Sequence, residues 1–198
     1  MTIDSSNPLL DPAAGRRDFL RTAGLAAAGV GALSLFETPA MAASRSAVKA
    51  GGDMDILQVA LALEHEGIAA YKIAGGSGLL SPDVLKVALV FLGHHNAHRD
   101  SLASLIQKAG GKPVESQSDA EYIKALNLGA LKSQLDVLNL AAGLEKGAAS
   151  AYLGQSLALK DKALTRLFVQ LSTDEAIHWS LLSVTAGNAV PAAAYLIS

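Results

Sequence analysis

The sequence contains no cysteine. This absence excludes disulfide bonds, cysteine-ligated zinc fingers, thiol catalysis and cysteine-ligated iron–sulfur clusters. Charge is also scarce, since 17% of the 198 residues are charged against about a quarter in an average soluble domain. The formal net charge is −2, and no Lys/Arg tract occurs after the first fifty residues. Because a nucleic-acid binder needs a basic surface, we expect no nucleic-acid partner.

Aromatic residues are few, with four Phe, four Tyr and one Trp. Ala and Leu dominate instead, with 37 and 32 copies. These two residues favour helices, whereas the aromatic and β-branched residues that favour strands are sparse. The composition therefore favours an all-α fold and argues against an all-β one. The length predicts one domain, or two at most.

The first 42 residues have the order of a secretory signal. Arg16 and Arg17 precede a weakly apolar run over residues 22–36, and the small-residue triplet Ala40-Met41-Ala42 follows it. This order predicts export and cleavage after Ala42. The paired arginines followed by Phe and Leu resemble a twin-arginine signal, which implies the twin-arginine export machinery as partner and a periplasmic or secreted location. That route carries folded proteins, often with a cofactor already inserted.

An N-terminal membrane anchor is the alternative for this segment. Its apolar run of 15 residues is shorter than the ~20 that a spanning helix needs, so the cleaved signal is favoured. We therefore divide the chain into a signal peptide, residues 1–42, and a mature domain, residues 43–198. No segment of the mature domain has 18 apolar residues without a charge, and we expect it to be soluble.

Apolar residues recur at three- and four-residue steps in four long segments of the mature domain. They predict helices over residues 53–74, 82–109, 131–159 and 161–187, with Ser81 capping the second helix at Pro82. A connection of about twenty residues, with a short helix near residues 119–128, separates the second from the third. Short, long and short connections predict a four-helix bundle with one long crossover. The apolar tail after residue 187 is expected to pack back on the bundle.

Charged or imidazole side chains interrupt the apolar face of each predicted helix. A buried carboxylate costs several kcal/mol unless it is paired or binds a metal. Such side chains at matching depth on four helices need a common cause. In chain order they are Glu64, then His95 and His98, then Glu145, then Glu175 and His178.

The two halves of the domain also resemble each other. "LEHEGIAAY" and "LEKGAASAY" each place a Tyr seven residues after the Glu, giving Tyr71 and Tyr152. Glu64 and Glu145 are 81 residues apart, while His95 to Glu175 and His98 to His178 are each 80 apart. Residues three apart on a helix share a face. Four helices that project such groups inward can build a two-metal site.

With this pattern the sequence resembles the ferritin-like superfamily of di-iron and di-manganese carboxylate proteins. The resemblance extends to rubrerythrins, manganese catalases and desiccation-related ferritin-like domains. It implies a ferritin-like four-helix bundle and a site for two iron or manganese ions, or for one. The implied ligands are Glu64, His98, Glu145, Glu175 and His178, with "DEAIHW" as a complete Glu-x-x-His motif.

The second helix departs from the family pattern. In "HHNAHR", His95 stands where a Glu is expected, and we interpret it as a substituted ligand. An imidazole in place of a carboxylate removes a carboxylate bridge and one negative charge. The site is then asymmetric, holds one ion firmly, or favours a lower oxidation state. Glu145 is expected to be shared between the ions.

Several neighbours are expected to support the ligands without binding metal. The hydroxyls of Tyr71 and Tyr152 are expected to orient Glu64 and Glu145 or their neighbours. His94 lies at the edge of the same face and is expected to contact a ligand or the surface. His65 and Glu66 point away from the site and are expected to be solvated or to contact a ligand. Taken alone, His98 would be interpreted as a hydrogen-bonded core histidine, and the Glu-x-x-His motif could occur by chance. The combination of the internal repeat, the spacing and the apolar flanks favours metal binding.

Two functions from different classes follow from the resemblance. The first is an exported oxidoreductase that acts on peroxide or dioxygen in defence against oxidative stress. The second is a non-enzymatic stress or desiccation-related metal-binding bundle with a modified site, which His95 favours. A metal-storage cage is a third possible function. It would need many subunits, so a homo-oligomer is one possible state of the protein. With no Cys-rich rubredoxin-like segment, a self-contained rubrerythrin-like peroxidase is disfavoured, leaving catalase-like dismutation or an external electron donor.

Overall fold

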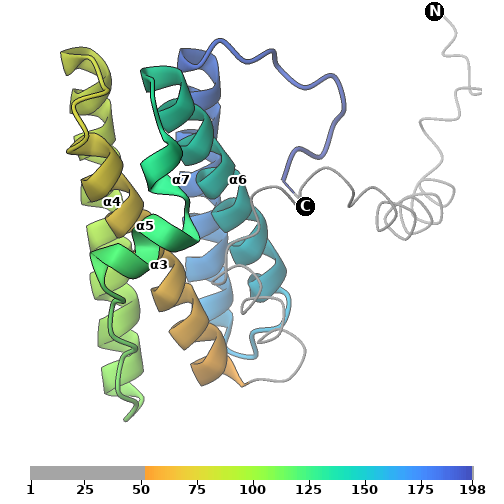
Figure 1. The fold of residues 1–198 in the computed structure, drawn as a ribbon. Coiled ribbons are helices and arrows are strands. Elements are labelled where there is room, and N and C mark those ends of the chain that lie inside the picture. The colour runs from red at the N-terminus through yellow and green to blue at the C-terminus, as the bar shows by residue number, and fades with distance from the viewer. Residues whose placement is uncertain (1–51, 198) are drawn as a thin grey trace, which may run out of the picture. The chain divides into compact units, whose positions relative to one another are not determined.

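The computed structural model describes residues 52–197, and every regular element in that range is helical. The predicted signal peptide, with Arg16 and Arg17, lies outside the described residues. The prediction of an all-α fold is confirmed. The elements in chain order are α3 (Asp53–Gly75), α4 (Pro82–Lys108), α5 (Asp119–Ala125), the 3-10 turn η5 (Leu128–Ala130), α6 (Gln134–Ser156) and α7 (Lys162–Thr185) (Figure 1).

Local side-chain chemistry sets where the helices begin. Asp161 accepts hydrogen bonds from the N–H groups of the first turn of α7, and Ser133 does the same for α6. The η5 turn and this Ser133 cap start α6 at Gln134, later than the predicted residue 131. Pro82 is the first residue of α4 as predicted, but the side chain of Ser81 forms no capping hydrogen bond.

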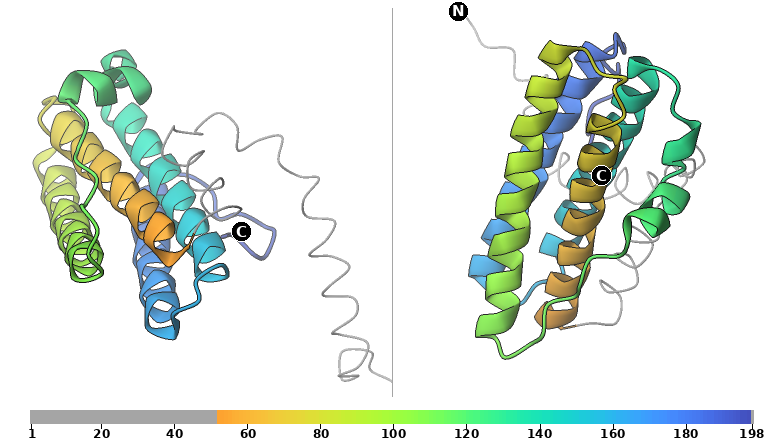
Figure 2. Two further views of the ribbon diagram at one scale, coloured as in Figure 1. Left: turned by 90° about the horizontal axis from the view of Figure 1, so that it is seen from below. Right: turned by 60° about the vertical axis from the view of Figure 1, so that its left-hand side comes forward.

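The helices form two antiparallel hairpins, α3 with α4 and α6 with α7, joined by a crossover (Figure 2). The crossover runs over residues 109–133 and packs α5 and η5 against α3. Leu126 and Leu128 of the crossover bury themselves against Ala70, which fastens it to the bundle. The predicted bundle with a single long crossover is confirmed.

Two apolar clusters divide the interior along the bundle axis. The larger contains Ile56, Leu61, Leu102 and Phe168, among others. The smaller contains Phe91, Leu138, Ala142 and Leu182. On each long helix the polar residues singled out in the sequence lie between the residues of these two clusters. The clusters thereby hold a polar layer inside an otherwise apolar core.

The tail does not pack back on the bundle, so that expectation is wrong. Most of residues 188–197 are exposed, including Val190 and Tyr195. Gly187 turns the chain away from α7 with a φ of 76°. Within residues 52–197, no helix is long and apolar enough to span a membrane.

Candidate metal centre

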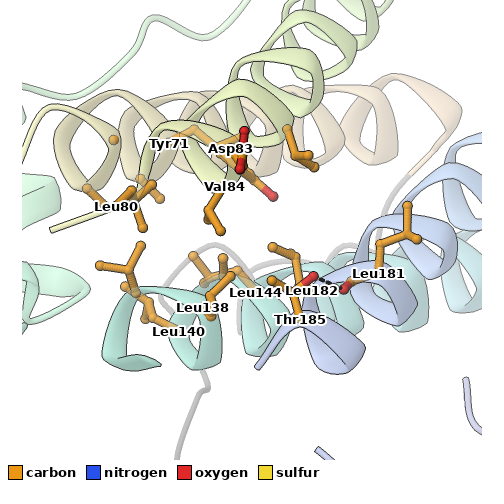
Figure 3. A pocket seen from close by; sticks show the side chains of 17 residues that line it. Tyr71, Leu80, Asp83, Val84, Leu138, Leu140, Leu144, Leu181, Leu182 and Thr185 are labelled. Carbon is orange, nitrogen blue, oxygen red and sulfur yellow. Dashed lines mark hydrogen bonds between the residues drawn. The ribbon is translucent and has the colours of Figure 1, made fainter. Parts of the chain in front are cut away.

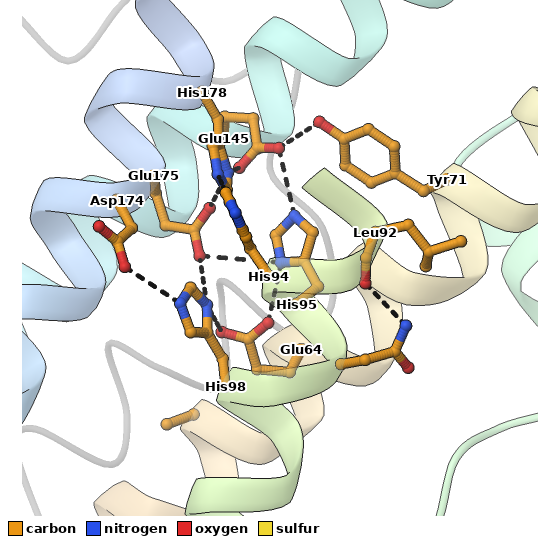
Figure 4. Close-up of polar contacts among 12 residues, drawn as sticks. Glu64, Tyr71, Leu92, His94, His95, His98, Glu145, Asp174, Glu175 and His178 are labelled. Atoms are coloured by element: carbon orange, nitrogen blue, oxygen red, sulfur yellow. Dashed lines mark hydrogen bonds and ion pairs between the residues drawn. The ribbon is translucent and has the colours of Figure 1, made fainter. Parts of the chain in front are cut away.

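All four long helices contribute to one buried polar cluster (Figure 4). Glu175 is fully buried, and the other two glutamates, His95 and His178 are nearly so. The side chain of His98 is 12% exposed, the most open of the set. The structure thus brings together the six predicted residues Glu64, His95, His98, Glu145, Glu175 and His178.

The cluster contains two overlapping sets of potential ligands. One set is Glu64, His95, His98 and Glu175, and the other is His95, Glu145, Glu175 and His178. Within each set, one ligand atom per residue lies within 4.8 Å of all the others. His95 and Glu175 belong to both sets. Glu175, and not Glu145 as expected from the sequence, is therefore the carboxylate common to the two.

The arrangement of these groups fits a bound cation. Nδ1 of His98, Oε2 of Glu145 and Oε1 of Glu175 are buried without a hydrogen-bond partner. These atoms are still close to atoms of other ligands, within ion-pair range. Nδ1 of His98 lies 3.2 Å from Oε1 of Glu175, and Nδ1 of His178 lies 3.5 Å from Oε2 of Glu145. A buried polar atom left unpaired costs about 1–3 kcal/mol, which a cation among these atoms would offset. Carboxylate and imidazole donors without sulfur suit iron or manganese.

A family model described as a ferritin-like domain matches residues 52–188. The chain belongs to the ferritin-like domain family. Among solved structures it is similar to a conserved hypothetical protein, rv2844, from Mycobacterium tuberculosis, with 21% identity and a TM-score of 0.58. That likeness covers 79% of this chain and 99% of the other, and it concerns the fold alone. No curated protein matches the chain.

The imidazole of His95 connects two carboxylates in this ferritin-like site. Its Nδ1 lies 2.8 Å from Oε2 of Glu64, and its Nε2 lies 3.2 Å from Oε1 of Glu145. Both nitrogens must carry a proton to donate to both carboxylates. Burial lowers the pKa of His95, but the charges of Glu145 and Glu64 outweigh it and raise the pKa well above the usual value. Without metal, His95 is an imidazolium at the position shared by the two ligand sets.

Space for this ring comes from Gly67 on α3. A Cβ atom at Gly67 would lie 3.3 Å from both Cε1 and Nδ1 of His95, tighter than an ordinary contact. Gly67 is therefore a site residue that the sequence reading placed only on the apolar stripe. Its signal in the sequence is a glycine three residues after the ligand Glu64, on the same helical face.

The charges of the metal-free cluster nearly cancel. Burial opposes ionisation of Glu64, but the hydrogen bond from His95 and the ion-pair contact with His98 lower its pKa to about 2. Carboxylate neighbours overcome burial to raise the pKa of His98 to about 10 and that of His178 to about 9. Burial and the nearby Glu145 raise the pKa of Glu175 to about 7. Metal ions must therefore displace protons from the imidazoles when they bind.

These pKa shifts predict a pH-dependent stability for the metal-free protein. The raised pKa values of His98 and His178 stabilise the fold fully below about pH 6.5, the unfolded histidine value. That contribution is lost as the pH rises through about 9 and 10. We expect the urea midpoint of chelator-treated protein to fall between pH 6.5 and 10. The midpoint of the variant His178→Gln should fall less over this range than that of the parent. The midpoint of His65→Gln, a change outside the cluster, should fall as much as that of the parent. A midpoint independent of pH over this range would contradict the ion-pair network.

Each tyrosine of the repeat contacts a glutamate of the other hairpin. Tyr152 on α6 donates to Oε1 of Glu64 at 2.5 Å, and Tyr71 on α3 donates to Oε1 of Glu145. Seven residues span about 10.5 Å along one helix, so a Tyr cannot reach the Glu of its own helix. Because α3 and α6 are antiparallel, each hydroxyl instead meets the opposite carboxylate. The sequence left this pairing open.

The two hydroxyls are expected to fix the carboxylates for metal binding. Tyr71→Phe or Tyr152→Phe removes one hydrogen bond to a ligand, and loss of such bonds weakens metal binding by about 10–100-fold. We expect a similar weakening, measured as metal affinity by competition with a chelator. Tyr122→Phe is the matched control, since Tyr122 is buried on α5 and its hydroxyl contacts the crossover. Equal affinities for all three variants and the parent would show that the hydroxyls do not orient the ligands.

Further residues contact the ligands from outside the cluster. Nδ1 of the exposed His94 lies 2.9 Å from Nε2 of His178, which agrees with its expected position at the edge of the site. Nε2 of His98 lies 3.3 Å from Oδ2 of Asp174. The sequence reading missed Asp174, although it directly precedes Glu175 in "DEAIHW".

The two residues beside Glu64 differ in their surroundings. Glu66 is only 5% exposed and therefore not solvated, which leaves the expected contact with a ligand. It lines a small cavity with Glu64 and with Ala148 of α6, because α6 covers that side of α3. Nε2 of His65 instead lies 3.1 Å from the carbonyl oxygen of Val114, and this contact joins α3 to the crossover.

Proposed function

We propose that this ferritin-like protein holds two iron or manganese ions and acts on peroxide or dioxygen in oxidative-stress defence. The observation that carries the proposal is the pair of overlapping ligand sets that share His95 and Glu175. Adjacent positions with common ligands suit a dinuclear centre better than two independent sites. The oxygen and nitrogen donors suit iron and manganese, and both of these metals can change oxidation state.

Different residues of the chain would bind each of the two ions. Glu64 and His98 would hold one ion, Glu145 and His178 the other, and Glu175 would contact both. When bound, the two ions supply the electron transfer that cleaves or forms an oxygen–oxygen bond. The hydroxyls of Tyr71 and Tyr152 orient the carboxylates of Glu145 and Glu64, respectively.

Surrounding residues control access of water and protons. The apolar clusters above and below the polar layer exclude bulk water from the buried carboxylates. Two hydrogen-bonded pairs lead from the ligands toward solvent, His178 with His94 and His98 with Asp174. The half-exposed Asp174 and the exposed His94 can exchange protons with water and hold a proton on the outer nitrogen of each ligand imidazole.

Metal content and peroxide turnover test this proposal together. Protein purified from its native host should contain two ions per chain by elemental analysis. The loaded protein should consume peroxide, or dioxygen with an added electron donor, and chelation should abolish the activity. Glu121→Gln, an exposed change on α5, should leave metal content and turnover unchanged. Protein that binds no iron or manganese under any loading condition would contradict the proposal.

A non-enzymatic metal-binding or stress protein is the second candidate. The observation that favours it is His95, which pairs with Glu64 and Glu145 as an imidazolium and offsets one of their two negative charges without metal. In this case the protein would fold stably after chelation and would bind one ion or none. Stoichiometric metal without peroxide or dioxygen turnover would also favour this second function.

We propose further that residues 1–42 direct the chain to the periplasm through the twin-arginine machinery. The support is the Arg16-Arg17 pair, the short apolar run and the Ala40-Met41-Ala42 triplet. The double change of Arg16 and Arg17 to Lys should trap uncleaved precursor in the cytoplasm, as measured by fractionation and immunoblotting. Arg21→Lys, outside the pair, should be exported normally. Normal export of the double variant would refute the twin-arginine assignment.

A further inference from the structure

A second cavity lies at the end of the bundle where α3 and α7 end and where α4 and α6 begin (Figure 3). Its volume is about 240 Å³. All four long helices line it, almost entirely with apolar side chains such as Val84, Leu138, Leu144 and Leu182. Ala88 and Ala141 line it as well, and their small side chains leave much of its space open. None of the predicted metal ligands lines this cavity.

The size and the opening of the cavity suit a small molecule. Aliphatic cavities of about 150 Å³ stay dry and bind benzene, and this one is larger. Val87 on α4 and Leu181 on α7 line it and are 44% and 49% exposed. The cavity therefore opens to solvent between these two helices. Burying apolar surface of a ligand there contributes roughly 25 cal/mol for each Å² removed from water.

The polar groups around the cavity disfavour a charge inside it. The hydroxyl of Thr185 donates to the carbonyl oxygen of Leu181, and the hydroxyl of Tyr71 donates to Glu145. The charged side chain among the lining residues is Asp83, on the exposed first turn of α4. An anion would meet the repulsion of Asp83, and a cation drawn into the cavity away from this exposed carboxylate would lose its hydration inside apolar walls.

We propose that this cavity binds a neutral apolar molecule of about ten to fifteen non-hydrogen atoms. The inference does not rest on metal binding, although the two sites share a wall. Tyr71 lines the cavity and bonds to Glu145, while Phe91 stacks on His178 and packs against Leu138 and Leu182. A bound molecule would therefore lie beside the buried polar cluster, with Tyr71 in the wall between them.

Three naphthalene derivatives of similar size test the proposal on the full chain. The neutral probe is 1-aminonaphthalene, the anion is 1-naphthalenesulfonate, and the cation is 1-naphthylmethylammonium. Equilibrium dialysis at pH 7.5 measures binding of each. We expect saturable 1:1 binding of the neutral probe, with both ions bound at least about ten-fold more weakly. No saturable binding of the neutral probe, or equally tight binding of either ion, would overturn the proposal.

Substitutions on α4 locate the bound probe. Ala88→Phe fills the cavity and should weaken binding of the neutral probe at least about ten-fold, while Ala97→Phe, exposed on the same helix, should leave it unchanged. Ala141→Leu fills the cavity from α6 and serves if Ala88→Phe does not fold, as judged by circular dichroism. Equal binding by a folded filled variant and the parent would refute the location.

The exposed tail is a rival occupant that a truncation distinguishes. The tail follows α7 directly, and Thr185 at the end of α7 lines the cavity. A chain that ends at Gly187 should bind the neutral probe with the same affinity as the full chain. A marked gain in affinity on truncation would identify residues 188–198 as the occupant and would overturn the proposal of a small-molecule site.

Discussion

Glu175→Gln is expected to remove both metal ions from the protein. Glu175 belongs to both ligand sets and is fully buried, so its loss affects each position at once. Loss of a group that only supports a ligand weakens metal binding by about 10–100-fold, and loss of a shared ligand should exceed about 100-fold at both positions. Gln keeps the shape of the side chain, which should preserve packing and leave the helical content unchanged.

Metal stoichiometry under identical loading measures this effect, with graded controls on other helices. Glu64→Gln and Glu145→Gln should each weaken one ion only, because each residue belongs to one set. Asp174→Asn, beside Glu175 on α7 but 51% exposed, should weaken binding by at most about ten-fold. If Glu175→Gln retained two ions with parental affinity, the shared carboxylate would have to be sought elsewhere.

His95→Glu is expected to strengthen metal binding and to make folding depend on it. The change restores the Glu-x-x-His pattern on α4 and adds a fourth carboxylate at the position common to both ligand sets. A carboxylate can bridge two ions, whereas an imidazolium must first lose its protons. Bound metal should rise toward two ions per chain, with about ten-fold or greater gain in affinity, and any oxidase or peroxidase activity should rise with it.

Without metal, the same variant should be less stable than the parent. The imidazolium of His95 pairs with both Glu64 and Glu145, and breaking a buried ion pair typically costs about 3–5 kcal/mol. Removal of metal by a chelator should therefore lower the midpoint of thermal unfolding of His95→Glu far more than that of the parent. His95→Ala should lose the pairing without gaining a ligand. If parent, His95→Glu and His95→Ala bound the same number of ions with the same affinity, His95 would not belong to the site.

Much of the fold follows from local features of the chain. A period of 3.6 residues and the flanking Gly and Pro predict the four long helices, because these signals act within one or two turns. Their ends shift by a few residues where a cap such as Ser133 or a short turn such as η5 competes. The lengths of the connections then favour two hairpins with one crossover, as observed.

The choice of candidate ligands also follows from the sequence. A Glu or His within an apolar stripe must face the core, whatever the exact packing of the helices. The internal repeat adds that Glu64 and Glu145 occupy equivalent levels, as do His95 and Glu175. The structure brings these residues together in one buried layer, while their binding of metal stays a prediction.

What joins one helix to another was decided only by the tertiary structure. A helical period places a side chain on a face, but it does not set the separation or the rotation of neighbouring helices. Those quantities pair Tyr152 with Glu64, give Glu175 its place in both ligand sets, and bury Glu66 under α6. The same quantities leave a cavity that is lined in part by the small side chains of Ala88 and Ala141. The sequence alone thus determined which side chains enter the core, and packing between the helices decided which of them meet there.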